Sequence, residues 1–233
     1  MTTPEEFIPR KQYVLVFDTE TTGLIPRKPK NSLDPIPMNE YPHIIQISFV
    51  LYDIVNRKLI SAYDSYVKID ENVVISKIAG DLTKITHDIC QNHGKNIVDV
   101  LIDFYHAYKY ADYIIAHNID FDEEMILIEL KRNHKEILSR SPECFTVFNK
   151  TYERIANVQR YCTMRKGINI CNIFTVPEEG KAPRKKWPRL SELHEKLFNG
   201  EAVEGLHNSM VDVMTCLKCY MKMSGAGDFE ISF

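Results

Sequence analysis

Residues 14–24, with the sequence VLVFDTETTGL, begin as an apolar, β-branched run and end in a glycine-containing turn. Such a run between polar segments predicts a buried β-strand. Side chains two residues apart in a strand point to the same face, so Asp18 and Glu20 are expected to lie side by side where the strand ends. Two adjacent carboxylates repel each other unless protons or cations compensate them. The segment therefore predicts a sheet protein with an acidic site at a strand end.

Two further strands are predicted after a long polar excursion. The excursion, residues 25–42, contains five prolines and is expected to form a surface loop rather than a helix. It is followed by the segments HIIQISFVLYD and RKLISAYDSYVKI, which are apolar and β-branched and are joined by a short polar turn. Together with the first strand they predict an antiparallel meander of three strands.

The rest of the chain alternates helical and strand patterns. Helical spacing occurs in KIAGDLTKITHDI, NIVDVLIDFYHAYKYA, FDEEMILIELKRNHKEIL, LSELHEKLF and SMVDVMTCLKCYMKM, and short strands are predicted at DYIIA and RYCTM. The predicted fold is α/β: a mixed five-stranded sheet, three antiparallel strands and then parallel ones, flanked by helices. We expect one domain over residues 13–223, with a leader over residues 1–12 and a tail over residues 224–233.

Charge and cysteine content restrict the binding partners and the cellular compartment expected for this domain. With 29 Lys and Arg against 32 Asp and Glu, the chain has no overall basic field, so any polyanion site must be local. The six cysteines are scattered through expected core segments, which favours a reduced, intracellular protein, cytoplasmic or nuclear. Cys216 and Cys219 form a CLKC spacing inside a helical pattern, where a buried helix face is expected rather than a metal site. No export signal and no apolar run of about 18 residues is present, so no membrane association is expected.

Two more segments place acidic residues beside polar residues typical of turns and loops. They are AHNIDFDEEM, after the fourth strand, and GLHNSMVDVM, at the start of the last helix. Together with FDTETTGL, these segments resemble the three motifs of the DEDDh exonuclease superfamily, the group that includes the proofreading subunit of bacterial DNA polymerase III. In the third motif, HNSMVD, histidine stands five residues before aspartate, as in that superfamily. The resemblance covers residues 13–220.

The resemblance implies an RNase H-like fold and a metal-dependent 3′–5′ exonuclease that releases nucleoside 5′-monophosphates from DNA or RNA. Two Mg²⁺ or Mn²⁺ ions are implied, which suits hard carboxylate oxygens. By the same resemblance, the metal-binding acids are Asp18, Glu20, Asp122 and Asp212, and the general base is His207. Asp120 competes with Asp122, but the superfamily pattern places its aspartate directly after phenylalanine, so Asp120 is instead expected to cap the helix.

Helical geometry tests the third motif. Five residues at about 100° each would place His207 and Asp212 far apart around a regular helix. If Asn208 or Ser209 caps the helix, His207 lies in the preceding loop and Asp212 in the first turn, and both can face the metals.

Substrate contacts are predicted around these motifs. Thr21 and Leu24 are expected to meet the terminal nucleotide, the alternative being a turn and a core leucine, and Asn118 is expected near the nucleotide. A basic tract could bind phosphates, or be a solvated loop or a localisation-like signal; it contains Lys181, Arg184, Lys185, Lys186 and Arg189 around Trp187. The excursion over residues 25–42 is longer than in compact superfamily members and could be a lid, a docking loop or neither.

The biological substrate stays open at this stage. Single-stranded DNA, RNA and a frayed primer terminus all fit one active site, and proofreading or repair is expected to require a polymerase or repair partner. Two alternatives differ in class. One is a catalytically weak nucleic-acid-binding or polymerase-accessory module with the same fold, and the other is an unrelated phosphoester hydrolase using the same acids.

Overall fold

The computed structural model describes residues 12–28, 34–176 and 182–225. The predicted leader and tail lie almost entirely outside these ranges, as do Lys181 and part of the excursion over residues 25–42. Within the described ranges, no helix is both long enough and apolar enough to cross a bilayer.

Five strands form one mixed sheet in the order β3-β2-β1-β4-β5. The strands are β1 (Tyr13–Thr21), β2 (Ile44–Asp53), β3 (Lys58–Tyr66), β4 (Tyr113–Ala116) and β5 (Gln159–Cys162). β1 pairs antiparallel with β2, and β2 with β3, whereas β4 runs parallel to both β1 and β5. The predicted sheet is confirmed. Because β1, β4 and β5 are parallel, their C-terminal ends lie at the same edge of the sheet.

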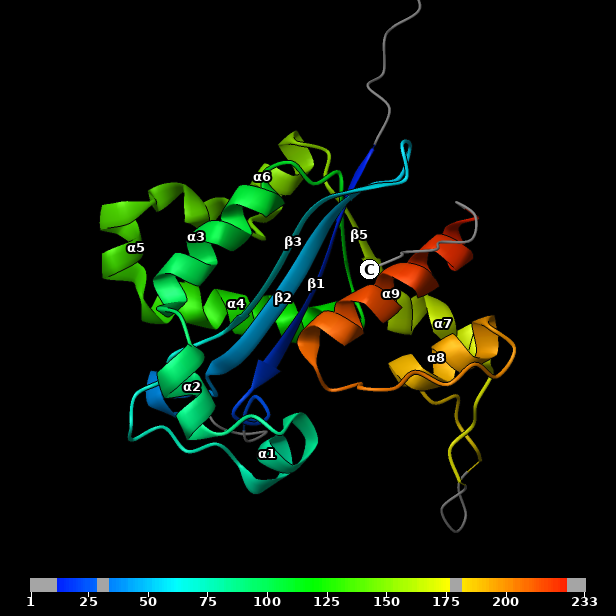
Figure 1. Ribbon diagram of the computed structural model, residues 1–233, viewed down its shortest axis with the longest axis horizontal. Helices are drawn as coiled ribbons and strands as arrows, with labels where there is room; N and C mark the ends of the chain where they lie inside the picture. The colour runs from blue at the N-terminus through cyan, green and yellow to red at the C-terminus, as the bar shows by residue number, and fades with distance from the viewer. Residues whose placement is uncertain (1–11, 29–33, 177–181, 226–233) are drawn as a thin grey trace, which may run out of the picture.

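Helices cover both faces of this sheet, and the alternation of β1 decides which residues meet which layer (Figure 1). Leu15 and Phe17 pack in the cluster that includes α3 (Ile97–Tyr108) and α4 (Ile119–Arg132). Val14 and Val16 pack in the opposite cluster, with α8 (Leu190–Leu197) and α9 (Ser209–Ser224). All four apolar side chains of this run are fully buried, as the strand prediction requires.

Two predicted helices are each interrupted by a local backbone feature. The segment KIAGDLTKITHDI forms α1 (Lys77–Thr83) and α2 (His87–His93), because Lys84 adopts a left-handed conformation and Thr86 caps a new helix. The segment FDEEMILIELKRNHKEIL forms α4 and α5 (His134–Arg140), separated at Asn133. The structure also contains elements that were not predicted: α6 (Lys150–Ile155), α7 (Thr163–Cys171), and the 3₁₀ turns η1 (Met38–Glu40) and η2 (Pro142–Thr146).

The described part of the excursion is anchored to the domain. Met38 and Tyr41 pack against the core, and Arg132 of α4 donates hydrogen bonds to the carbonyls of Tyr41 and Pro42 at 3.1 and 3.0 Å. Apart from η1, this part is irregular, as its prolines predict. On α9, the CLKC residues Cys216 and Cys219 are both buried and free, which confirms the prediction of a buried helix face.

Candidate active site

Side chains at the end of β1 point alternately to the two faces of the sheet. Asp18 and Glu20 continue the alternation of Val14 and Val16 and therefore point toward α9. Thr19, between them, points toward α4 and is buried. Side chains at this strand end can thus meet groups from both helical layers.

α4 supplies the second acid directly after β4. Asn118 stands at the N-cap position in a left-handed conformation, φ 71°, and turns the chain from strand into helix. Asp122, only 2% exposed, accepts hydrogen bonds at Oδ1 from the backbone N–H of Thr19 at 3.0 Å and from its hydroxyl at 2.8 Å. The prediction that Asp120 caps α4 is wrong: Asp120 lies inside the first turn, is exposed, and pairs with Arg165.

α9 supplies the third motif, with the capping that the motif geometry requires. Asn208 caps the helix by accepting hydrogen bonds from the N–H groups of Met210 and Val211. His207 therefore lies in the preceding loop, in a left-handed conformation with φ 69°. Its backbone N–H donates to Asp212 Oδ2 at 2.9 Å, which fixes the loop against the first turn.

Ser209 joins α9 to β1. Its hydroxyl donates to the backbone carbonyl of Asp18 at 2.8 Å, and its backbone N–H donates to Gln46 of β2 at 3.4 Å. Ser209 and Gln46 are both buried. The beginning of α9 is thereby held on the same strand that carries Asp18 and Glu20.

These elements bring the predicted acids into one electrostatic cluster. Glu20, His207 and Asp212 each offer a ligand atom within 4.8 Å of the others. Burial, followed by the charges of Asp122, Asp212 and Glu20, raises the pKa of Asp18 well above its usual range. Burial and the charges of Asp212 and Asp122 raise the pKa of Glu20 to about 8. Burial also raises the pKa values of Asp122 and Asp212, so the cluster binds protons readily when no cation is present.

A cavity of about 390 Å³ adjoins this cluster. Glu20, Thr21, Leu24 and His207 all contribute to its lining. Leu24 is 86% exposed, so the alternative of a core leucine is wrong. The hydroxyl of Thr21 donates to the carbonyl of Gly23 at 2.7 Å and thereby shapes the turn.

Three large apolar residues of this cavity were not identified from the sequence. Ile78 and Leu82 of α1 are 75% and 50% exposed, and Phe121 of α4 also lines the cavity. A detectable signal existed on α1, because residues four apart lie on one helix face and two exposed apolar side chains there leave an apolar surface open to solvent. The sequence could not show which surface of the molecule that pair would face.

Other predicted contacts lie outside this cavity. Asn118 does not belong to its lining. The neighbouring His117 is enclosed, with its ring nitrogens 3.0 Å from the Thr163 hydroxyl and from the Pro188 carbonyl, and burial lowers its pKa to about 4. In the described part of the basic tract, Lys185 donates to Asn169 of α7 and Lys186 pairs with Glu192 of α8.

Comparison with known proteins identifies a family and several solved structures of similar fold. The family model described as exonuclease matches residues 15–220, in agreement with the motif resemblance. No curated protein sequence matches the chain.

Among solved structures, E. coli exonuclease I in complex with a dT13 oligonucleotide has a TM-score of 0.61 at 16% identity, over 92% of this chain and 41% of that one. Apo exonuclease I has a TM-score of 0.63 at 16% identity, over 93% and 42%. A product-bound exonuclease I has a TM-score of 0.61 at 16% identity, over 93% and 44%. The chain therefore shares this fold and spans about two fifths of the length of these structures.

Proposed function

Because the chain belongs to the exonuclease family, we propose that it is a DEDDh-type enzyme that hydrolyses DNA or RNA from the 3′ end and releases nucleoside 5′-monophosphates. The observation that carries this proposal is the convergence of Glu20, His207 and Asp212 beside Asp18 and Asp122 at one strand edge. The family match supports nuclease chemistry. The direction, the metals and the base rest on the motifs and on this geometry.

The donor set fits divalent metal. Buried carboxylates with raised pKa values gain most from a cation that replaces their protons, and hard oxygen ligands suit Mg²⁺ or Mn²⁺. We assign metal binding to Asp18, Glu20, Asp122 and Asp212. Two such ions, when bound, supply an activated water and stabilise the leaving oxygen of a phosphodiester.

We assign the general base to His207. Its side chain is exposed, lines the cavity and lies next to Glu20 and Asp212, where an attacking water can reach it. The backbone hydrogen bond to Asp212 positions the loop without using the imidazole. The ring nitrogens therefore remain free of that bond, and one of them can take the proton from the attacking water.

The apolar cavity supports a binding mode for the 3′ end. Leu24, Ile78, Leu82 and Phe121 offer apolar surface for an unstacked base, which favours a single strand or a frayed primer terminus. Exonuclease I is described with dT13 and dA16 oligonucleotides, and we transfer a single-stranded end to this chain on the basis of the cavity. In a proofreading or repair role, a polymerase or repair partner would deliver such an end.

The direct test is an assay of 5′-labelled single-stranded DNA and RNA oligonucleotides, with Mg²⁺, with Mn²⁺ and with chelator. A ladder that shortens from the 3′ end and disappears with chelator is the expected result, and the faster polymer identifies the substrate class. Folded protein that gives no ladder under any metal would favour the accessory binding module. Cleavage of small phosphoesters without cleavage of oligonucleotides would favour the unrelated hydrolase.

Replacing Leu24 with alanine is expected to raise KM for an oligonucleotide about tenfold, because the base loses apolar contact surface and burial of a leucine side chain is worth about 1.5–3 kcal/mol. Steady-state kinetics would check this value. Leu138→Ala on α5 is the matched control, since Leu138 is also exposed but does not line the cavity. Equal changes in KM for the two variants would contradict the assignment.

Millimolar Mg²⁺ or Mn²⁺ is expected to raise the melting temperature. A ligand that binds only the native state at about 100 times its Kd stabilises it by about 2.7 kcal/mol, which corresponds to about 5–10 °C in a domain of this size. The shift should be larger at pH 8 than at pH 5.5, because at pH 5.5 the metal must displace protons from carboxylates with raised pKa values. Thermal scans with and without metal at both pH values measure it, and an unchanged curve at saturating metal would contradict a preformed site.

A further inference from the structure

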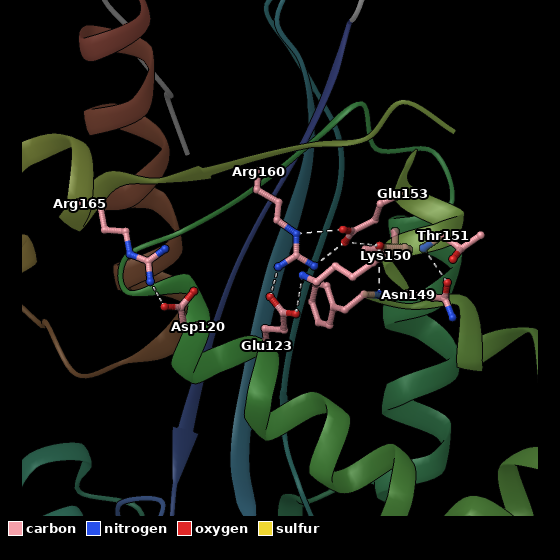
Figure 2. Close-up of polar contacts among 10 residues, drawn as sticks. Asp120, Glu123, Asn149, Lys150, Thr151, Glu153, Arg160 and Arg165 are labelled. Atoms are coloured by element: carbon pink, nitrogen blue, oxygen red, sulfur yellow. Dashed lines mark hydrogen bonds and ion pairs between the residues drawn. The ribbon is translucent and has the colours of Figure 1, made fainter. Parts of the chain in front are cut away.

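A second cleft, of about 400 Å³, lies beside the beginning of α4 on the side of β5 and α7. Four basic side chains line it, Lys150, Arg160, Arg165 and Lys166, together with the exposed carboxylate of Asp120. Figure 2 shows Arg165 facing Asp120, and Arg160 and Lys150 facing Glu123. The sequence analysis singled out none of these four cations.

One of the four cations has a structural role. Arg160 is half-buried, pairs with Glu123, and holds both carboxylate oxygens of Glu153 at 2.7 and 2.9 Å. Glu153 is buried and also accepts a hydrogen bond from the Tyr108 hydroxyl at 3.0 Å. Removing the charge of Arg160 would leave the buried carboxylate of Glu153 without its charged partner, so Arg160 has a structural role.

The other three cations are exposed and only weakly engaged. The side chains of Arg165 and Asp120 are 53% and 56% exposed, and an ion pair on such a surface contributes only about 0–1 kcal/mol. Lys150 lies 3.3 Å from a carboxylate of Glu123 that Arg160 already neutralises. Lys166 has its ammonium 5.9 Å from the centre of the Tyr161 ring. A phosphate can therefore replace these surface contacts at small cost.

The position of the cleft relates it to the acidic cluster. Asp120 precedes Asp122 by two residues of α4, a rise of about 3 Å and a rotation of about 200°, so the cleft and the acidic cluster flank the same helical turn from opposite sides. Arg165 and Lys166 lie at the beginning of α7, directly after β5, and β5 ends at the same sheet edge as β4 and β1. In the sheet, β4 lies between β1, whose end adjoins the apolar cavity, and β5, whose end adjoins this basic cleft.

We propose that the cleft binds backbone phosphates of the substrate strand upstream of the scissile bond, with Arg165 and Lys166 as the main contacts and Lys150 at the far end. The inference rests on the proposed function, which supplies a strand whose 3′ end occupies the apolar cavity. A guanidinium can bind a phosphate with two parallel hydrogen bonds, and the positive end of the α4 dipole adds to the attraction. Phosphate contacts fix a strand without reading its bases, so DNA and RNA are both accepted.

The first test measures binding without catalysis, by fluorescence anisotropy of labelled 12-nucleotide dT and rU strands with Asp18→Asn protein. Adding Arg165→Glu and Lys166→Glu is expected to weaken binding at least tenfold. The slope of log affinity against log salt should fall by about 1.4, because each single-strand phosphate contact contributes about 0.7. Asp120→Asn is expected to tighten binding about two- to fivefold, since it removes the carboxylate that competes for Arg165.

The matched control is Lys131→Glu with Lys135→Glu, a pair of exposed lysines on α4 and α5 that do not line the cleft, so that the charge changes by the same amount. Unchanged affinity in the variant with Arg165→Glu and Lys166→Glu, or an equal loss in the control variant, would overturn the inference. A melting temperature within about 2 °C of the parent identifies folded variants, and Arg165→Gln, which adds no negative charge beside Asp120, is the second substitution if Arg165→Glu does not fold.

The second test separates the cleft from the proposed function. In otherwise unchanged protein, Arg165→Glu with Lys166→Glu should raise KM for the 12-nucleotide strand about tenfold and KM for a dinucleotide less than twofold. Equal increases for both lengths would place these residues at the terminal nucleotide and overturn the inference. If the parent protein cleaves both substrates and the variant matches it, only the cleft inference fails. If the parent cleaves neither, the proposed function fails, and the anisotropy result alone decides whether the cleft binds a strand.

Discussion

Replacing Asp18 with asparagine is expected to lower kcat about 10³-fold and, at the same time, to stabilise the metal-free protein. Loss of one metal-binding carboxylate removes several kcal/mol of transition-state stabilisation, and about 4 kcal/mol corresponds to that factor in rate. Stabilisation follows because Asp18 is buried among three other acids that repel its charge. Few residues combine a catalytic loss with a gain in stability, so the paired result is diagnostic.

The sign of the stability effect follows from proton linkage. The pKa of Glu20 is near 4.5 in the unfolded chain and about 8 in the folded protein. Between these values the native state binds more protons than the unfolded state, so stability falls as pH rises through this window. The pKa of Asp18 is also raised well above its usual range in the folded protein, so asparagine at this position removes a second group of this kind, and its benefit should grow as pH rises above the ordinary pKa of an aspartate.

Melting curves in chelator at pH 5.5 and pH 8, together with oligonucleotide kinetics in Mg²⁺, test both parts of this prediction. At pH 8 we expect the Asp18→Asn protein to melt about 2–4 °C higher than the parent, as about 1 kcal/mol produces in a domain of this size. Asp99→Asn on α3 is the control, because Asp99 is exposed and pairs only at the surface with Arg140. A lower melting temperature in chelator would mean that the Asp18 carboxylate supports the fold and is not held against repulsion.

Local periodicity predicted the part of the site that a single strand determines. Alternation in β1 placed Asp18 and Glu20 on one face, and the structure confirms it, with Val14 and Val16 on the same face. Capping chemistry at Asn208 likewise predicted that His207 lies in the loop before α9. Both inferences use only neighbours in the sequence, and the information needed for them is contained in a few consecutive residues.

The features that were missed depend on long-range contacts or on backbone conformations without a sequence pattern. Asp122 is held by Thr19, which is 103 residues away, and that contact exists only after β1 and α4 have packed. Lys84 takes a left-handed conformation that ends α1, although lysine is a good helix former. Asp120 is a suitable capping residue by type, but Asn118 already occupies the N-cap position and leaves Asp120 to Arg165.

Replacing His207 with asparagine is expected to lower kcat about 10²–10⁴-fold, the range that a general base contributes. Asparagine is the informative choice because it tolerates the left-handed conformation at this position and keeps the backbone N–H that Asp212 accepts. Since the imidazole is exposed, added imidazole should restore part of the rate. The variant should also become faster at higher pH, where hydroxide replaces the missing base.

The same variant decides between two roles for His207. Its imidazole lies within 4.8 Å of ligand atoms of Glu20 and Asp212, a spacing that also fits a metal ligand. A base acts on water and leaves metal affinity unchanged, whereas loss of a ligand weakens metal binding by about 10-fold or more. Calorimetric titration of Mn²⁺ into the His207→Asn protein, beside the imidazole rescue, therefore separates the roles. Unchanged Mn²⁺ affinity with rescue supports the base, and weakened affinity without rescue would reassign His207 to the metal site.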